Sequence, residues 1–343
     1  MTLLSVNNLT LQFDTDEGRI TAVDDVSFDV SAGEVLGIVG ESGSGKSVTA
    51  KALMQLNPSN AVYGEQSKIM LNVDDQSIDV LSLKTGNDLR VVRGGAVSMI
   101  FQEPMASFAP AITIGSQMVE QLVLHKNISV KEAKDISVEM LERVGISDAE
   151  KRFYQYAFEL SGGMRQRAMI AMALSTRPSL LIADEPTTAL DVTIQAQVID
   201  LMKDLINDFG MGIIFITHDL GVIAQTADRV AVMYLGRIVE QGSVRDVIRK
   251  PAHPYTRGLL NALPKLDDLD APLTPVPGDI PSPLERPAGC VFSTRCPLVE
   301  ARCSSTVPDR VDFDAGHSAA CFVTAEERGN NAARQGDPDT GVV

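Results

Sequence analysis

The 343-residue sequence predicts an α/β fold, and four segments support that prediction. Residues 34–39 are short, apolar and partly β-branched, which is typical of a buried strand. After a Gly-rich turn, residues 48–56 contain no Gly or Pro and carry Ala, Leu and Met, so they predict a helix. The apolar runs 180–183 and 212–217 both end in polar residues, as expected of buried strands that carry ligand-binding groups at their carboxyl ends.

The turn after the first of these strands fits the phosphate-binding pattern G-x-x-x-x-G-K-[ST] in full. Its glycines allow backbone amides to face phosphates at the positive end of the following helix. We expect Lys46 to reach the β- and γ-phosphates of a nucleotide and the Ser47 hydroxyl to bind Mg²⁺. A Gly-rich turn without a ligand is the alternative, which the flanking strand and helix disfavour. The predicted ATP-binding residues of the loop are Gly40, Ser42, Gly43, Ser44, Gly45, Lys46 and Ser47.

Two acidic residues, Asp184 and Glu185, follow the apolar run 180–183 directly. An acidic pair at a strand end is common on protein surfaces, and alone it would indicate nothing more. Together with a phosphate-binding loop, the pair predicts that Asp184 holds Mg²⁺, partly through water.

An octapeptide at residues 160–167, Leu-Ser-Gly-Gly-Met-Arg-Gln-Arg, lies between the loop and the acidic pair. It resembles the signature of ABC-type ATPases, whose nucleotide is clamped between two subunits. The resemblance implies a P-loop NTPase fold with an antiparallel β edge and a helical subdomain. It also implies that the signature of one subunit completes the γ-phosphate site of its partner. The signature positions are Leu160, Ser161, Gly162, Gly163, Arg165 and Gln166.

The resemblance assigns further positions of the ATP site. Glu185 matches the general base for the attacking water, a role that typically contributes ~100- to 10,000-fold in rate. Gln102, after the apolar strand 97–101, matches the glutamine that contacts the metal and water and senses the transmembrane partner. His218 matches the switch histidine near the γ-phosphate. A lone histidine at a strand end is more often structural, but its distance beyond Glu185 favours the catalytic role.

Two other matches concern the adenine and the dimer interface. Phe13 is the candidate for the aromatic ring that stacks on adenine, with an apolar core contact as the alternative. Ala189, Leu190 and Asp191 match the D-loop, which crosses the interface between the two ATPase subunits.

The chain continues beyond the predicted ATPase core with a segment that narrows the family. The His-Pro-Tyr-Thr element at 253–256 resembles the element that follows the ATPase core in dipeptide/oligopeptide importers, and 275–281 and 289–292 continue that pattern. Met164 in the signature resembles the D-type subunit of these importers, because the F-type sister usually has Gln there.

The predicted organisation has three parts. Residues 1–250 form the nucleotide-binding domain, with a helical subdomain at about 105–175, where Ser129 followed by Glu132 predicts a capped helix. Residues 251–323 form the C-terminal extension. Residues 324–343, with few apolar side chains, predict a disordered tail.

All four cysteines, Cys290, Cys296, Cys303 and Cys321, fall in the C-terminal extension. A cytosolic protein does not need disulfides, so the clustering favours a metal. Four thiolates suit either Zn²⁺ or an iron–sulfur cluster. The resemblance implies a [4Fe-4S] cluster, because related importer subunits carry one on this pattern; Zn²⁺ and free or oxidised thiols stay as alternatives. His317 is a spare candidate ligand, with a packing role as its alternative.

Composition excludes several classes of protein. The net charge of −15 argues against a nucleic-acid binder and against direct docking on anionic lipid. No apolar run approaches the ~20 residues of a membrane span, and the N-terminus lacks the charged and apolar regions of a secretory signal. We therefore expect a peripheral protein at the cytoplasmic face of the cell membrane, attached through partners.

These observations predict an ATP-hydrolysing subunit, with ATP and Mg²⁺ as cofactors, that powers import of di- and oligopeptides. The resemblance implies a second, F-type ATPase subunit, two membrane permeases and an extracytoplasmic peptide-binding protein as partners. Import of nickel chelates or other small solutes is the alternative within the family. A soluble ABC ATPase of DNA repair or translation would need a second ATPase core, a long coiled coil or basic surfaces, and the sequence has none of these.

Overall fold

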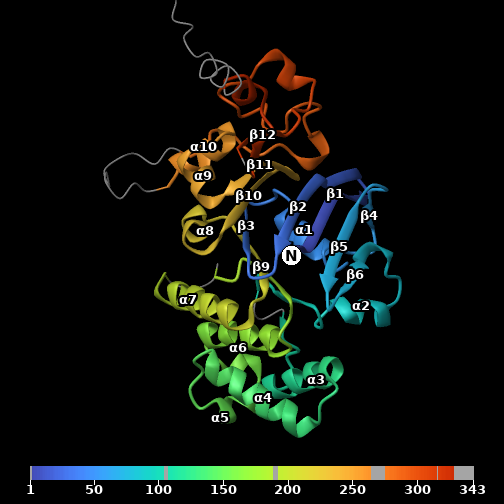
Figure 1. Ribbon diagram of the computed structural model, residues 1–343, viewed down its shortest axis with the longest axis vertical. Coiled ribbons are helices and arrows are strands. Elements are labelled where there is room, and N and C mark those ends of the chain that lie inside the picture. The colour runs from blue at the N-terminus through green and yellow to red at the C-terminus, as the bar shows by residue number, and fades with distance from the viewer. Residues whose placement is uncertain (1, 104–106, 188–191, 264–274, 315, 328–343) are drawn as a thin grey trace, which may run out of the picture.

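The computed structural model describes residues 2–103, 107–187, 192–263, 275–314 and 316–327, which form two sheets with helices around them (Figure 1). The larger sheet has the strand order β12-β13-β11-β10-β3-β9-β8-β7, and the smaller has β2-β1-β5-β6 with β4 paired to β1. Parallel pairing joins β10, β3, β9, β8 and β7. The structure therefore confirms the α/β fold and its antiparallel edge.

The strands of the larger sheet are β3 (Val35–Val39), β7 (Val97–Ile100), β8 (Leu180–Asp184), β9 (Gly212–Thr217), β10 (Arg229–Tyr234), β11 (Arg237–Ser243), β12 (Val311–Asp314) and β13 (His317–Ala319). The strands of the smaller sheet are β1 (Thr2–Thr15), β2 (Gly18–Ser31), β4 (Ala61–Tyr63), β5 (Lys68–Val73) and β6 (Gln76–Asp79). Every residue of β3, β8 and β9 is buried, as their apolar runs predict. These three strands separate two apolar clusters, one toward the smaller sheet and one toward the helices.

The helices are α1 (Lys46–Ala52), α2 (Gly86–Val92), α3 (Ile114–Lys126), α4 (Val130–Arg143), α5 (Ala149–Phe153), α6 (Gly162–Ser175), α7 (Val192–Phe209), α8 (Leu220–Thr226), α9 (Val244–Arg249) and α10 (Pro254–Asn261). The structure corrects the end of α1, which was predicted to reach Leu56. It ends four residues earlier, because the chain turns at Gln55, whose φ of 50° is not helical.

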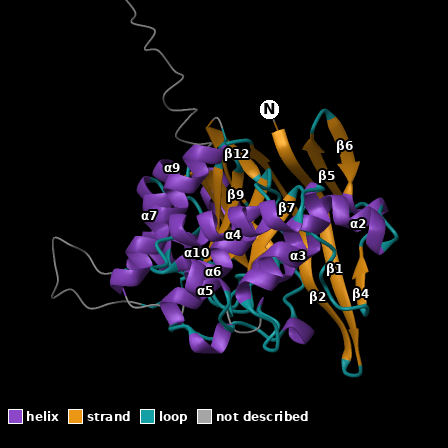
Figure 2. Ribbon diagram, turned by 90° about the horizontal axis from the view of Figure 1, so that it is seen from below, coloured by secondary structure: helices purple, strands orange, loops and turns teal. Residues whose placement is uncertain are grey.

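The helices α3 to α6, which span most of the predicted helical subdomain, pack against one another at the opposite end of the molecule from the C-terminal extension (Figure 1). Ser129 and Glu132 form the predicted capping box at the start of α4, each side chain bonding the other residue's backbone N–H. Figure 2 shows β1, β2, β4 and β5 together at one side and most helices at the other. No helix among the described residues combines the length and the apolar character needed to cross a membrane.

The C-terminal extension is joined to the larger sheet through β13, which pairs with β11. Glu240 of β11 and His317 of β13 form a fully buried contact, with 2.8 Å between Oε1 and Nε2. The Glu240 carboxylate also accepts the backbone N–H groups of Ala252 and His253, each at 2.8 Å. His317 thus packs against Glu240. This packing role was the alternative to a role of His317 as a metal ligand.

The start of the predicted tail needs a correction, because residues 322–327 are helical. Thr324 is buried and its hydroxyl donates to the carbonyl of Ala252 at 2.6 Å. Ordered structure therefore continues past residue 324. Residues 328–343 of the predicted tail lie outside the described residues.

Candidate nucleotide site

The phosphate-binding loop connects the end of β3 to α1, as the motif predicts. Gly45 has a φ of 97°, and a Cβ atom there would lie 2.6 Å from the carbonyl oxygen of Ala22, so the position requires glycine. The ammonium of Lys46 donates to the carbonyls of Gly40 at 2.7 Å and Glu41 at 3.0 Å. Burial lowers the pKa of Lys46, against the opposing effect of nearby carboxylates. The lysine is thus held inside the loop.

A hydroxyl and a carboxylate meet beside the loop, in a pair suited to Mg²⁺. Ser47 donates from Oγ to Oδ1 of Asp184 at 3.0 Å, which joins the start of α1 to the end of β8. Burial raises the pKa of Asp184, although the bond from Ser47 opposes that rise. Oxygen ligands of this kind fit a hard cation such as Mg²⁺, and the two lie together as expected.

The Glu185 carboxylate lies between the other two predicted catalytic side chains. Gln102 donates from Nε2 to Oε2 of Glu185 at 3.2 Å, and His218 Nδ1 lies 3.5 Å from Oε1. The backbone N–H of Glu185 donates to the carbonyl of Ile216 in β9 at 2.9 Å. Glu185 has a φ of 48°, an uncommon conformation for a non-glycine residue that costs ~1–3 kcal/mol.

A cavity of about 210 Å³ lies over the phosphate-binding loop, and Gln102 and Glu185 are among the residues that line it. Phe13 is not part of its lining, but Ile20, its cross-strand partner in β2, is. The role of Phe13 in adenine binding therefore stays a prediction. The cavity is also lined by residues that belong to no nucleotide-binding motif and that tertiary packing brings to the site. These are Ile20, Thr21, Ala22, Leu235, Gly236 and Pro283.

The signature residues do not line this cavity, because they belong to α6 and the turn before it. Ser161 is the N-cap of α6 and accepts the backbone N–H of Met164 at 3.3 Å. Leu160 and Gln166 are buried, and Gln166 donates to the carbonyl of Pro186, next to the acidic pair. Ser161 and Gly162 are exposed, so the start of α6 is open to a partner. The predicted D-loop residues Ala189, Leu190 and Asp191 lie outside the described residues.

The four cysteines of the extension line one small cavity of about 10 Å³, next to Phe292. None forms a disulfide. Burial, with a smaller contribution from the other three thiols, raises the pKa of Cys290 to about 11. Sulfur donors thus converge, but the described residues contain no group of three or more His, Cys, Asp or Glu side chains placed to hold a metal ion. The predicted cluster site is not supported as a formed metal site. The four are Cys290, Cys296, Cys303 and Cys321.

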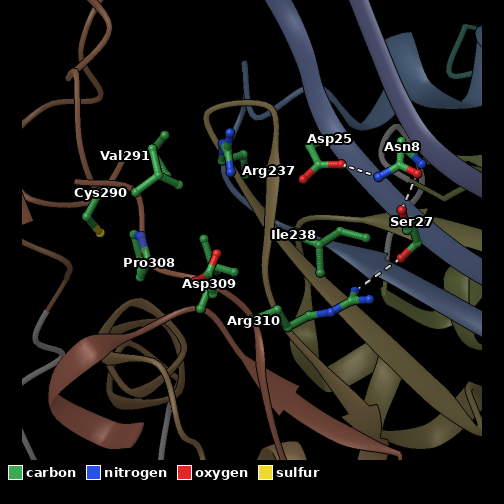
Figure 3. A pocket seen from close by; sticks show the side chains of 13 residues that line it. Asn8, Asp25, Ser27, Arg237, Ile238, Cys290, Val291, Pro308, Asp309 and Arg310 are labelled. Carbon is green, nitrogen blue, oxygen red and sulfur yellow. Dashed lines mark hydrogen bonds between the residues drawn. The ribbon is translucent and has the colours of Figure 1, made fainter. Parts of the chain in front are cut away.

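A larger cavity, of about 490 Å³, lies between the smaller sheet, β11 and the extension (Figure 3). Among the residues that line it, Asn8 donates to Asp25 at 2.8 Å, and Arg310 donates to the carbonyl of Ser27 at 3.3 Å. None of the phosphate-binding residues lines it. Although this cavity is larger, it is not the candidate nucleotide site, because the phosphate-binding residues line the cavity of about 210 Å³.

One chain thus carries a phosphate-binding loop beside the acidic pair and, on a separate element, an exposed signature. This arrangement defines an ATPase of the ATP-binding cassette class. The sequence matches the "ABC transporter" family over residues 23–188 and the "Oligopeptide/dipeptide transporter, C-terminal region" family over residues 239–303.

The chain belongs to the family of oligopeptide and dipeptide transport ATP-binding proteins. It is 49% identical to the oligopeptide transport ATP-binding protein AppD of Bacillus subtilis, over 95% of this chain and 98% of that protein. It is also 49% identical to OppD of Escherichia coli, over 95% and 94%, and 44% identical to the dipeptide transport ATP-binding protein DppD of Bacillus subtilis, over 98% of both.

Solved structures share the fold. The dimeric ATP-binding cassette MJ0796, in a post-hydrolysis state bound to ADP and Pi, superposes with a TM-score of 0.62 at 24% identity, covering 71% of this chain and 99% of that one. The ABC transporter component cbiO1 of Clostridium perfringens gives a TM-score of 0.60 at 24% identity, covering 73% and 91%.

Proposed function

We propose that this ATPase powers the import of di- and oligopeptides by closing, around ATP, against a second ATPase subunit of F type. The observation that carries the proposal is the separation of the two half-sites on one chain. The exposed Ser161 at the start of α6 lies outside the cavity formed by the phosphate-binding loop. A complete site then needs the loop of one subunit and the signature of the other. The oligopeptide names of the relatives support the choice of substrate.

The loop and the carboxylates perform separate tasks in this proposal. Lys46 and the loop amides hold the phosphates, while Ser47, Asp184 and Gln102 would hold Mg²⁺, which neutralises charge on the β- and γ-phosphates. Glu185 takes a proton from the attacking water as the water oxygen bonds to the γ-phosphorus and ADP leaves. His218 is placed to contact the γ-phosphate. ATP held between the two faces favours the closed dimer, and loss of the γ-phosphate removes that preference.

The helical subdomain offers a surface for the permeases. Tyr154, Tyr156 and Phe158 precede the signature and are exposed, with Phe158 58% exposed. The rings of Tyr156 and Phe158 stack with centroids 5.4 Å apart. Exposed aromatic side chains in a group are typical of protein interfaces. Docking there would hold the subunit at the cytoplasmic face of the membrane. An extracytoplasmic binding protein would deliver peptide to the permeases from the opposite side.

In this proposal the four cysteines would hold a [4Fe-4S] cluster, with Zn²⁺ as the alternative, and their thiols would have to move from the described arrangement, which is not a formed metal site. The support is their convergence on one cavity and the absence of disulfides among them. A cluster there would fasten a small segment that has little apolar core of its own. The visible absorption spectrum of anaerobically purified protein tests the assignment. A broad iron–sulfur band is expected. A featureless spectrum with stoichiometric zinc would show that the site binds zinc and would reject the cluster.

Uptake of labelled peptide by the reconstituted transporter tests the transport role. The complete assembly should accumulate peptide only with ATP, and the Glu185→Gln assembly should not accumulate it although it binds ATP. Uptake of a nickel chelate in place of peptide would reject the substrate class and retain the ATPase. ATP-independent uptake would reject the role itself.

A further inference from the structure

The C-terminal extension contacts the phosphate-binding loop at Glu41, the second residue of the loop. The Arg295 guanidinium donates to both carboxylate oxygens of Glu41, at 2.7 Å from one terminal nitrogen and 3.2 Å from the other. Only 3% of the Arg295 side chain is exposed, against 30% for Glu41. A two-pronged arginine–carboxylate pair fixes orientation as well as distance. Glu41 does not line the nucleotide cavity, so its carboxylate serves this contact.

Glu41 is also held through its backbone. Its N–H donates to the Tyr255 hydroxyl at 2.9 Å, and its carbonyl accepts from the Lys46 ammonium at 3.0 Å. Tyr255 is fully buried in α10 and belongs to the His-Pro-Tyr-Thr element. One loop residue therefore joins the extension on one side to the phosphate-binding lysine on the other.

The groups that hold Glu41 are themselves well anchored. Arg295 donates to the carbonyls of Pro277 at 2.9 Å and Val276 at 3.0 Å. The Tyr255 ring packs against Tyr234 at 4.7 Å and Phe292 at 5.4 Å between centroids. Side chains locked in this way hold what they contact in a single geometry.

The position of Arg295 in the chain connects the thiol-lined cavity to the phosphate-binding loop. It lies between Cys290 and Cys296, inside the segment that carries the thiol-lined cavity. The segment that carries the thiol-lined cavity therefore contacts the phosphate-binding loop directly through the Arg295 guanidinium.

We propose that Arg295 and Tyr255 are positioning residues for ATP, through which the C-terminal extension sets the nucleotide affinity of the phosphate-binding loop. The inference rests on the proposed role of that loop in binding ATP. Neither residue touches the nucleotide; both act through Glu41, whose place fixes the Lys46 ammonium and the amides that follow.

The test measures ATP affinity of the full-length chain by calorimetry for Arg295→Gln, Glu41→Gln and the double variant. Each single change should weaken ATP binding about tenfold, within the usual range of coupling between sites. The double variant should bind ATP no more weakly than either single variant, because each of the three variants removes the same Arg295–Glu41 contact. In the assembled transporter the KM for ATP should rise while kcat is unchanged, which a general loss of folding would not produce.

Two milder variants extend the test. Tyr255→Phe removes only the hydroxyl that accepts the Glu41 N–H and should weaken ATP binding in the same direction. Arg295→Lys keeps the charge but loses the two-pronged geometry, and should recover part of the affinity lost in Arg295→Gln. If Arg295→Gln does not fold, Tyr255→Phe and Glu41→Gln decide the question.

Arg302 provides the matched control. It lies in the same extension and pairs with Glu300 at 2.8 Å and Glu326 at 2.6 Å, but these pairs are exposed, so Arg302→Gln should bind ATP as the unmodified chain does. Unaltered affinity in folded Arg295→Gln, Glu41→Gln and Tyr255→Phe would overturn the inference, as would additive losses in the double variant. Failure of the unmodified chain to bind ATP would instead overturn the proposed function.

Discussion

The hydroxyl of Ser47 and the carboxylate of Asp184 form a hydrogen bond of 3.0 Å, although 137 positions separate them in the chain. The bond places the start of α1 against the end of β8. It brings together the two oxygen groups that we propose as Mg²⁺ ligands, at the edge where the parallel strands end.

Replacement of Asp184 by Asn should abolish the Mg²⁺ dependence of nucleotide binding, because a neutral amide is a poor ligand for this ion. Titration of Mg²⁺ against a bound, non-hydrolysable ATP analogue measures the effect. Asp219, which caps α8 through the Gly221 N–H at 2.7 Å, supplies the control, since Asp219→Asn should keep the Mg²⁺ dependence.

The same titration should depend on pH. Burial raises the pKa of Asp184, so this carboxylate takes up a proton at a higher pH than an exposed aspartate. The protonated form does not hold Mg²⁺. Mg²⁺ affinity should therefore fall as the pH drops through that raised pKa, starting above the usual value of 3.8. Affinity that stays constant down to the ordinary aspartate range would contradict this assignment.

Loss of the Glu240 carboxylate should destabilise the fold. Glu240→Ala leaves His317 and two backbone N–H groups buried without their acceptor, which should lower the free energy of unfolding by about 3–5 kcal/mol. Chemical denaturation measures the difference. Glu326→Ala, which removes an exposed partner of Arg302, should change the free energy of unfolding little. Equal losses in the two variants would show that burial of the Glu240 pair is unimportant.

The Glu240 contribution should also disappear in acid. Burial alone would raise the pKa of Glu240, but hydrogen bonds from His317, Ala252 and His253 outweigh it and hold that pKa below its usual value. Because the folded pKa is lowered, the stabilisation is complete above the unfolded pKa and is lost as the pH falls through the folded one. The acid side of the stability curve should therefore be flatter in Glu240→Ala.

The aromatic surface before the signature should be needed for assembly but not for nucleotide binding. Phe158→Asp should prevent co-purification with the permeases while ATP affinity is unchanged, because a charge is costly in a buried interface. Val91→Asp, at a residue 55% exposed on α2, is the control and should co-purify normally. Normal assembly of Phe158→Asp would place the permease contact elsewhere.

Local signals explain what could be predicted from the sequence. The phosphate-binding loop, the buried strands and the Ser129 cap depend on residues a few positions apart, and all are present in the structure. Contacts between distant segments carry no such signal. Ile20 reaches the nucleotide cavity only because β2 folds over it, and Arg295 meets Glu41 across 254 positions. The clustering of the four cysteines in the extension favours a metal, but it does not predict the arrangement of the four thiols.

The turnover of the assembled transporter carrying Glu185→Gln tests the central claim most directly. If Glu185 is the base that activates water between the two closed faces, this variant should bind ATP normally. Its hydrolysis should fall by ~100- to 10,000-fold. Hydrolysis at the unmodified rate would contradict the claim.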